Sequence, residues 1–83
     1  NYQEVISLCR RVKKEMPEKD IWLYTGYTYD EVQQDILRSP VLTEIAYLVD
    51  GRYEQNNPTI KPFRGSDNQV CHKLVNGLSV EQF

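Results

Sequence analysis

Residues 21–28 (IWLYTGYT) constrain the fold more than any other part of the chain. The stretch begins with four consecutive apolar or aromatic residues, a pattern typical of a short strand that is buried on both faces. Gly26 then permits a sharp turn, or the close approach of a ligand to the backbone. Thr28 and Glu31 form a capping box, so a helix begins at once. The stretch therefore predicts a strand end, a glycine turn and a helix N-terminus, which is where α/β sheets bind ligands.

Two helices are expected on either side of this strand. Residues 3–16 predict an amphipathic helix that ends before Pro17. Its apolar stripe is expected to consist of Val5, Leu8, Cys9, Val12 and Met16. Residues 29–38 predict a second helix, and Pro40 can start one more helical turn through residue 44. The expected core face of the second helix is Val32, Ile36 and Leu37.

Two further strands are expected after the second helix. Residues 45–50 (IAYLVD) predict a strand parallel to the first and joined to it by the helical crossover of a βαβ unit. A polar loop follows at 52–62, and residues 70–75 predict a third strand. Asn76-Gly77 is a turn signal, and the remainder is expected to be a tail. The fold class is α/β, with a short, mostly parallel sheet and two to three helices.

The size and charge of the chain exclude several classes of protein. Its 83 residues allow a single small domain with a modest core. A net charge of -2 does not suggest binding to nucleic acid, and no apolar run is long enough to span a membrane. The two cysteines, Cys9 and Cys71, lack the close spacing of a zinc or iron–sulfur motif. Two free thiols without an export signal favour a cytoplasmic setting.

Polar residues and glycines at the strand ends are the candidate site. In a parallel sheet, Thr25-Gly26-Tyr27 and Asp50-Gly51-Arg52 would lie at the same edge. Arg52 could hold a carboxylate or phosphate bidentately, and Asp50 could accept hydrogen bonds from an amine or a ribose. The alternative is that these are ordinary strand-end turns, with Asp50 and Arg52 paired together or solvated. From spacing alone, the ordinary turns are the stronger interpretation.

Two other residues with functional side chains have simpler interpretations. His72 follows Cys71, but neighbours on a strand point to opposite faces, so the two are not a catalytic pair. We expect an exposed histidine and a core cysteine. Trp22 is expected to pack in the core and not to serve as a stacking platform.

Three ordered motifs give the chain a family resemblance. IWLYTGYT at 21–28, LVDGRY at 48–53 and FRGSDNQ at 63–69 together resemble the activating proteins of anaerobic ribonucleoside-triphosphate reductase. These are radical S-adenosylmethionine enzymes, related to the activase of pyruvate formate-lyase. The resemblance extends from about residue 3 to about residue 75 and implies a fragment of a partial (βα) barrel, in which strand ends converge on one mouth.

The resemblance also implies cofactors and a partner. Members of the family reduce S-adenosylmethionine with a [4Fe–4S] cluster, and the resulting radical abstracts hydrogen from a glycine of the partner reductase. Their Cys-x3-Cys-x2-Cys loop lies near the family's N-terminus, ahead of residue 1 of this sequence, which also starts without methionine. Residues 1–83 are therefore expected to be the C-terminal half of such a domain. Alone, this half is expected to bind no cluster, since thiolates hold such clusters, and to be inactive.

The three motifs would form part of the S-adenosylmethionine cradle. The resemblance assigns to it Thr25, Gly26, Tyr27, Asp50, Arg52, Ser66, Asn68 and Gln69. The first motif would lie near the nucleoside or methionine end, the second would face the same ligand, and the third would hold the adenosine side.

Two alternatives remain open alongside this interpretation. One is a fragment of a pyruvate formate-lyase-type activase, although the third motif and the short length favour the reductase activator. The other is a non-catalytic module that binds a small ligand or a protein partner. As a truncated half-barrel, the fragment would expose a sheet edge and apolar surface, so we expect it to associate through that edge or face.

Overall fold

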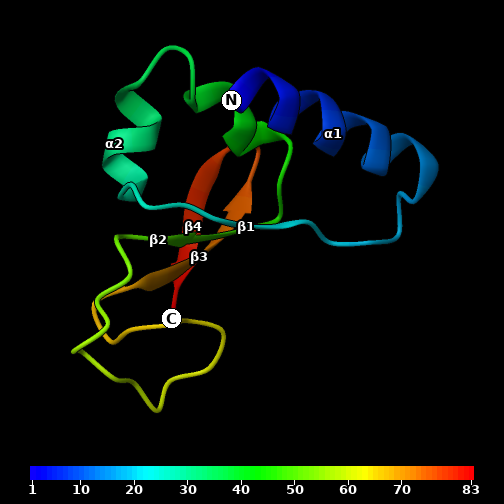
Figure 1. The fold of residues 1–83 in the computed structure, drawn as a ribbon. Coiled ribbons are helices and arrows are strands. Elements are labelled where there is room, and N and C mark those ends of the chain that lie inside the picture. The colour runs from blue at the N-terminus through cyan, green and yellow to red at the C-terminus, as the bar shows by residue number, and fades with distance from the viewer.

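The computed structural model describes residues 1–83, which fold into a four-stranded sheet with helices packed on one face (Figure 1). The elements in chain order are α1 (Tyr2–Glu15), β1 (Trp22–Tyr24), α2 (Tyr29–Gln34), the 3-10 helix η1 (Ser39–Thr43), β2 (Tyr47–Asp50), β3 (Val70–Val75) and β4 (Leu78–Gln82). The α/β class is thus confirmed. No helix combines the length and the apolar character needed to cross a bilayer.

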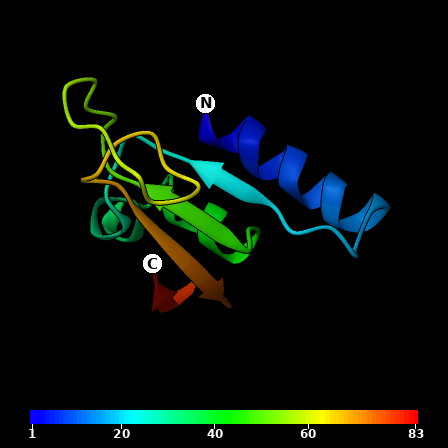
Figure 2. The same cartoon turned by 90° about the horizontal axis from the view of Figure 1, so that it is seen from below.

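The strands lie in the order β1-β2-β3-β4, and Figure 2 shows the first three side by side. β1 and β2 are parallel, with Leu23 opposite Leu48, so the predicted βαβ crossover is confirmed. β3 is antiparallel to both β2 and β4, so the sheet is mixed and not mostly parallel as expected. The reason is the connection: a parallel return needs a long crossover, usually helical, whereas β2 and β3 are joined by a loop without one.

Residues 78–82, expected to be a tail, form the fourth strand. Asn76 and Gly77 both have positive φ, 52° and 81°, which is the backbone of a two-residue type I′ hairpin turn. β4 therefore folds back on β3, and the backbone groups of Cys71 and Phe83 exchange hydrogen bonds of 3.0 and 2.9 Å. The Asn-Gly pair was identified as a turn, but the strand after it was missed.

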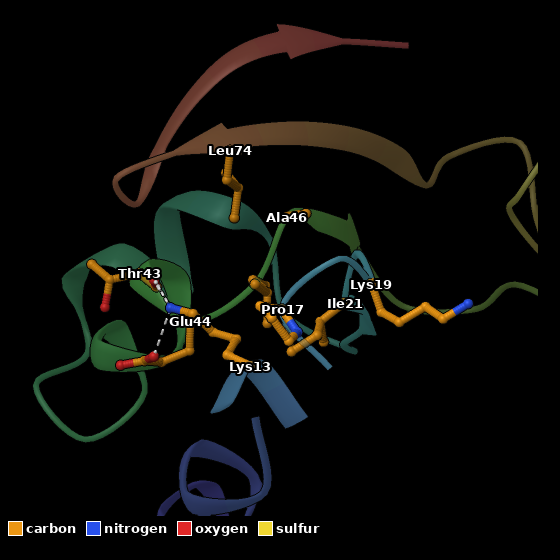
Figure 3. A pocket seen from close by; sticks show the side chains of 9 residues that line it. Lys13, Pro17, Lys19, Ile21, Thr43, Glu44, Ala46 and Leu74 are labelled. Carbon is orange, nitrogen blue, oxygen red and sulfur yellow. Dashed lines mark hydrogen bonds and ion pairs between the residues drawn. The ribbon is translucent and has the colours of Figure 1, made fainter. Parts of the chain in front are cut away.

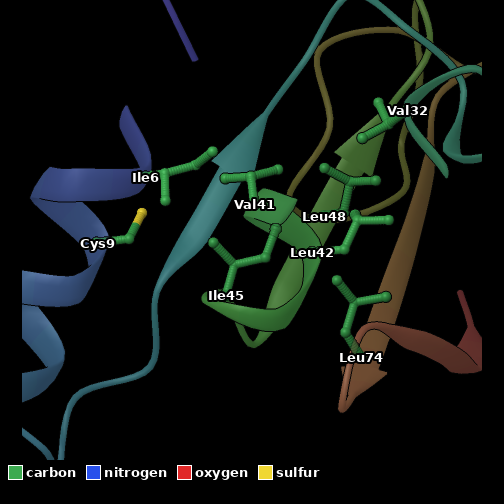
Figure 4. Close-up of a cluster of buried hydrophobic side chains, with 8 residues drawn as sticks. All are labelled: Ile6, Cys9, Val32, Val41, Leu42, Ile45, Leu48 and Leu74. Carbon is green, nitrogen blue, oxygen red and sulfur yellow. The ribbon is translucent and has the colours of Figure 1, made fainter. Parts of the chain in front are cut away.

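The core lies between the sheet and the three helical segments (Figure 4). Leu48 and Leu74 lie on the inner face of the sheet, and each helix contributes to the same cluster. The buried members are Ile6, Cys9, Val32, Val41, Leu42, Ile45, Leu48 and Leu74.

The apolar stripe predicted for α1 is only partly correct. Cys9 is buried and Val5 is partly buried, but Leu8 is 53% exposed and Met16 is also exposed. Ile6, absent from the predicted stripe, is buried instead. α1 packs mainly against the short η1, so only the residues that face this segment are covered.

The second helix is shorter than predicted, ending at Gln34. The Asp35 carboxylate accepts hydrogen bonds from the N–H groups of Leu37 (2.8 Å) and Arg38 (3.2 Å), a local pattern that competes with helix continuation. As a result, Ile36 and Leu37 are 86% and 66% exposed, and their assignment to the core is wrong. The predicted turn after Pro40 is confirmed as η1.

β1 is an edge strand and is not buried on both faces as expected. Its neighbours lie only on the β2 side, and Tyr24 is 57% exposed. Trp22 is half-buried on the outer face, where its ring stacks on Tyr47 with the centroids 4.2 Å apart.

The capping box that starts α2 is confirmed. The Thr28 side chain accepts a hydrogen bond from the Glu31 N–H (3.2 Å), and the Glu31 carboxylate accepts one from the Thr28 N–H (2.9 Å). These bonds lower the pKa of Glu31 below its usual value, the bond to the Thr28 backbone contributing most.

We expect Thr28→Ala to lower the free energy of unfolding by about 1 kcal/mol, because the cap bond to the helix N-terminus is lost. Urea denaturation followed by circular dichroism measures this loss. Thr28→Ser, which keeps the hydroxyl, is the matched control and should stay within about 0.5 kcal/mol of the wild type. Equal losses in the two variants would contradict a capping role.

Candidate functional site

A pocket of about 350 Å³, here called the corner pocket, lies where β1 and β2 end. It is lined by Tyr24, Thr25, Gly26, Gly51, Tyr53, Gly65 and Gln69. β1 and β2 are parallel, so their ends share one edge of the sheet, and antiparallel β3 begins at that same edge. Gly26, Gly51 and Gly65, one from each of the three sequence motifs, therefore meet at one pocket, and we call them the three glycine corners.

Gly26 is a glycine that the fold itself does not require. A Cβ atom built on it would have no heavy atom within 4 Å, and its φ lies outside the left-handed region. By contrast, Gly51 has a φ of +86°, and a Cβ on Gly65 would lie 2.8 Å from the Tyr53 ring. The absence of a side chain at Gly26 leaves the backbone open on the pocket side, as close contact with a ligand would need.

Hydrogen bonds fix the first corner to the second. The buried Thr25 hydroxyl lies 2.9 Å from the Tyr2 hydroxyl and accepts a bond from the Tyr27 N–H (3.2 Å). The Tyr27 carbonyl accepts a bond from the Gly51 N–H (2.9 Å). The backbone around Gly26 is thus held by its neighbours on both sides.

Gln69 connects the third corner to the second. Its amide oxygen accepts bonds from the N–H groups of Gly65 (2.8 Å) and Ser66 (3.2 Å), and its amide nitrogen donates to the Gly51 carbonyl (3.1 Å). Of the candidates in the third motif, only Gln69 lines the corner pocket.

Ser66 and Asn68 hold the loop in shape. The Ser66 hydroxyl, fully buried, accepts a bond from the Glu54 N–H (3.0 Å) and donates one to the Asn68 side chain (2.6 Å). Asn68 also donates to the Arg52 carbonyl (2.8 Å). The side chains of both residues are thus engaged within the loop.

Asp50 lies outside the corner pocket, in a separate buried cluster. Its carboxylate accepts bonds from the backbone N–H groups of Tyr29 (2.8 Å) and Val70 (3.2 Å) and from Nε2 of His72 (2.9 Å). Burial alone would raise the pKa of Asp50, but these bonds, led by the one from His72, lower it overall. Asp50 therefore holds the α2 N-terminus and β3 together. The Arg52 side chain is exposed, lines no pocket and makes no ion pair with Asp50.

His72 is buried, contrary to the expectation of an exposed residue. It is 5% exposed, its Nδ1 lies 2.8 Å from the Ser79 hydroxyl, and its ring stacks on Tyr29 with the centroids 5.0 Å apart. The ring of Tyr29, the first residue of α2, covers His72 on one face of β3. Cys71, its neighbour on the strand, is buried on the other face, as expected.

A second pocket, of about 250 Å³, lies at the opposite end of the parallel strands (Figure 3). Ile21 and Ala46, which line it, precede β1 and β2. Its Lys13 ammonium is 3.1 Å from the Glu44 carboxylate and 3.5 Å from the Thr43 carbonyl. One of its two lysines, Lys13, is thus already paired, and the Glu44 carboxylate also lines the pocket, so this pocket is the weaker candidate for an anion.

The side chains of this chain do not fit an iron–sulfur cluster. The two cysteines lie on α1 and β3, and no group of three or more His, Cys, Asp or Glu side chains could hold a metal ion. Burial also raises the pKa of Cys9 and of Cys71, whereas cluster irons bind thiolates.

Comparison with known proteins identifies the family. The family described as "4Fe-4S single cluster domain" matches residues 1–72, so the chain belongs to this family. No solved structure matches significantly.

The chain is similar to several proteins named anaerobic ribonucleoside-triphosphate reductase-activating protein. It is 45% identical to that of Enterobacteria phage T4 over 78 residues, 94% of this chain. The identity is 47% over 77 residues (90% of this chain) for Vibrio cholerae and 40% over 76 residues (89%) for Escherichia coli K12. The resemblance inferred from the three motifs is thereby confirmed. The chain spans about half the length of these relatives, 47–48% of each.

Sequence reasoning missed two aromatic residues of the corner pocket. Tyr24 and Tyr53 line it, and the Tyr24 hydroxyl donates to the Phe63 carbonyl (2.6 Å), joining β1 to the loop before β3. Both tyrosines lie within motifs already identified, Tyr24 in the first and Tyr53 at the end of the second. Their position next to glycine corners is the signal that could have found them.

Proposed function

We propose that this chain is the C-terminal half of a radical S-adenosylmethionine activase for anaerobic ribonucleoside-triphosphate reductase in the cytoplasm, and that the corner pocket holds S-adenosylmethionine. The names of the similar proteins support the reaction and the partner. The meeting of three glycine corners at one pocket is the observation that supports the ligand site.

The chemistry of the corner pocket suits a nucleoside-bearing zwitterion. The rings of Tyr24 and Tyr53 offer aromatic surface to a base, while Gly26 leaves its exposed backbone accessible. A volume of about 350 Å³ falls in the range of small-molecule sites, about 300–1,000 Å³. In this proposal, Thr25, Ser66, Asn68 and Asp50 support the pocket walls, and Arg52 stays a predicted ligand contact.

The reaction divides between this chain and groups outside it. When bound, a [4Fe–4S] cluster would supply the electron for cleavage of the sulfonium, and in this proposal thiolates outside residues 1–83 would hold it. The residues of this chain bind and orient the nucleotide.

We expect Gly26→Ala to weaken S-adenosylmethionine binding at least tenfold, about 1.4 kcal/mol, because the added methyl group occupies the pocket wall. The full-length protein, reconstituted anaerobically with iron and sulfide, is titrated with S-adenosylmethionine by calorimetry. The urea midpoint should not change, since the methyl group meets no atom of the protein.

Gly51→Ala is the contrasting variant, because a φ of +86° strains any other residue, and we expect it to lose stability as well as affinity. Unchanged affinity in Gly26→Ala would remove Gly26 from the cradle. A wild-type protein without affinity for S-adenosylmethionine, or one that produces no glycyl radical signal in the reductase by electron paramagnetic resonance, would overturn the proposed function.

A further inference from the structure

Arg38, which follows α2, lies between two tyrosines. Its guanidinium carbon is 4.2 Å from the centre of the Tyr27 ring and 5.3 Å from that of the Tyr2 ring. Its Nη2 donates to the Tyr27 hydroxyl (2.9 Å), and its Nη1 pairs with the Asp35 carboxylate. One planar cation thus contacts α1, the segment after β1 and the segment after α2 at the same time.

Both tyrosines hold the corner that contains Gly26. The Tyr2 hydroxyl bonds to the Thr25 hydroxyl (2.9 Å), and the Tyr27 backbone bonds to Thr25 and to Gly51. Gly26 has no side chain to fix its own position. The backbone at this corner is thus held in part by Tyr2 and Tyr27, and Arg38 contacts the rings of both.

Stability alone explains Arg38 poorly. Its Nε is buried without a hydrogen-bond partner, which costs free energy of folding. Its partner Asp35 is partly exposed, and ion pairs of that kind contribute little. Leucine or glutamine could cover the same rings without burying a charged donor.

We propose that Arg38 is a positioning residue that fixes the Gly26 corner for ligand binding, an inference that rests on the proposed function. It acts through Tyr27 and Tyr2 and does not line the corner pocket itself. Its role is to preorganise the backbone at Gly26, so that ligand binding does not have to order that backbone.

The test compares Arg38→Gln with Arg10→Gln in the full-length, reconstituted protein. Each removes one arginine that pairs with a carboxylate, but Arg10 pairs with Glu44, at the opposite end of the parallel strands. We expect Arg38→Gln to raise the Kd for S-adenosylmethionine about tenfold, with kcat at saturating S-adenosylmethionine within about twofold of the wild type. Arg10→Gln should change neither value.

Tyr27→Phe supplies a second readout, because it removes only the hydroxyl that accepts from Arg38. We expect a roughly threefold rise in Kd, and a double variant no weaker than Arg38→Gln alone, since both changes break one contact. Unchanged Kd in folded Arg38→Gln, or additive effects, would overturn the inference. If Arg38→Gln does not fold, unchanged Kd in Tyr27→Phe overturns it. A wild-type protein that fails to bind S-adenosylmethionine refutes the proposed function instead.

Discussion

Asp50→Ala is expected to lower the free energy of unfolding by about 3 kcal/mol or more, because each buried donor that loses its acceptor costs about 1–3 kcal/mol. The change leaves the N–H groups of Tyr29 and Val70 and the Nε2 of His72 without their acceptor. Urea denaturation at pH 7 measures the loss. Asp67→Ala is the matched control: its carboxylate pairs with Lys61 at 3.5 Å but is about half exposed, so the loss should stay below about 1 kcal/mol.

The free energies of unfolding of the wild type and of Asp50→Ala should also respond differently to acid. The pKa of Asp50 is lower in the folded chain than its ordinary value of 3.8, so in acid the unfolded chain binds a proton more readily. The contribution of the carboxylate is therefore complete above about pH 4 and is lost as the pH falls through the lowered pKa. The stability difference between wild type and Asp50→Ala should shrink over that range. A constant difference down to pH 3 would show that the carboxylate charge is not what holds the cluster.

Leu48→Ala is expected to cost about 3 kcal/mol, whereas Leu37→Ala should cost less than about 0.5 kcal/mol. Leu48 is fully buried in the centre of the cluster shown in Figure 4, and truncation would leave a cavity between η1 and the sheet. Leu37 is 66% exposed. The same chemical change at two positions isolates the effect of burial, and chemical denaturation of both variants measures it.

This comparison also tests a difference between sequence and structure. The sequence pattern places Leu37 in the core because helical periodicity runs on from Val32. A comparable loss from Leu37→Ala would favour the longer helix over the turn made by Asp35. A loss only from Leu48→Ala would support the shorter helix.

Features set by neighbouring residues were predictable from the sequence. The Thr28 capping box and the turn after Pro40 follow from short patterns, and the parallel pairing of β1 with β2 follows from the helical connection between them; all three are present. Features set by distant residues were not. Whether β1 lies at an edge, and whether Leu8 is covered, depends on what packs there, and no local pattern contains that information.

The candidate site was likewise predictable only in part. The glycine corners could be predicted because the ends of parallel strands share an edge, and Gly26, Gly51 and Gly65 do meet at the corner pocket. The direction of the Asp50 side chain could not, because successive residues of a strand face opposite sides and a shift of one residue reverses the assignment. The Asp50 carboxylate oxygens accept hydrogen bonds from Tyr29, Val70 and His72, and the sequence had suggested that His72 was exposed.

The loop between β2 and β3, which projects away from α1 in Figure 1, is fastened to the sheet at both of its roots, where Asp50 pairs with Val70. Its length can therefore change without altering the strand register beneath it. Insertions and deletions there would reshape the part of the corner pocket that the loop contributes and leave the strands intact. The shape of the pocket and the folding of the sheet could then diversify independently among proteins built on this scaffold.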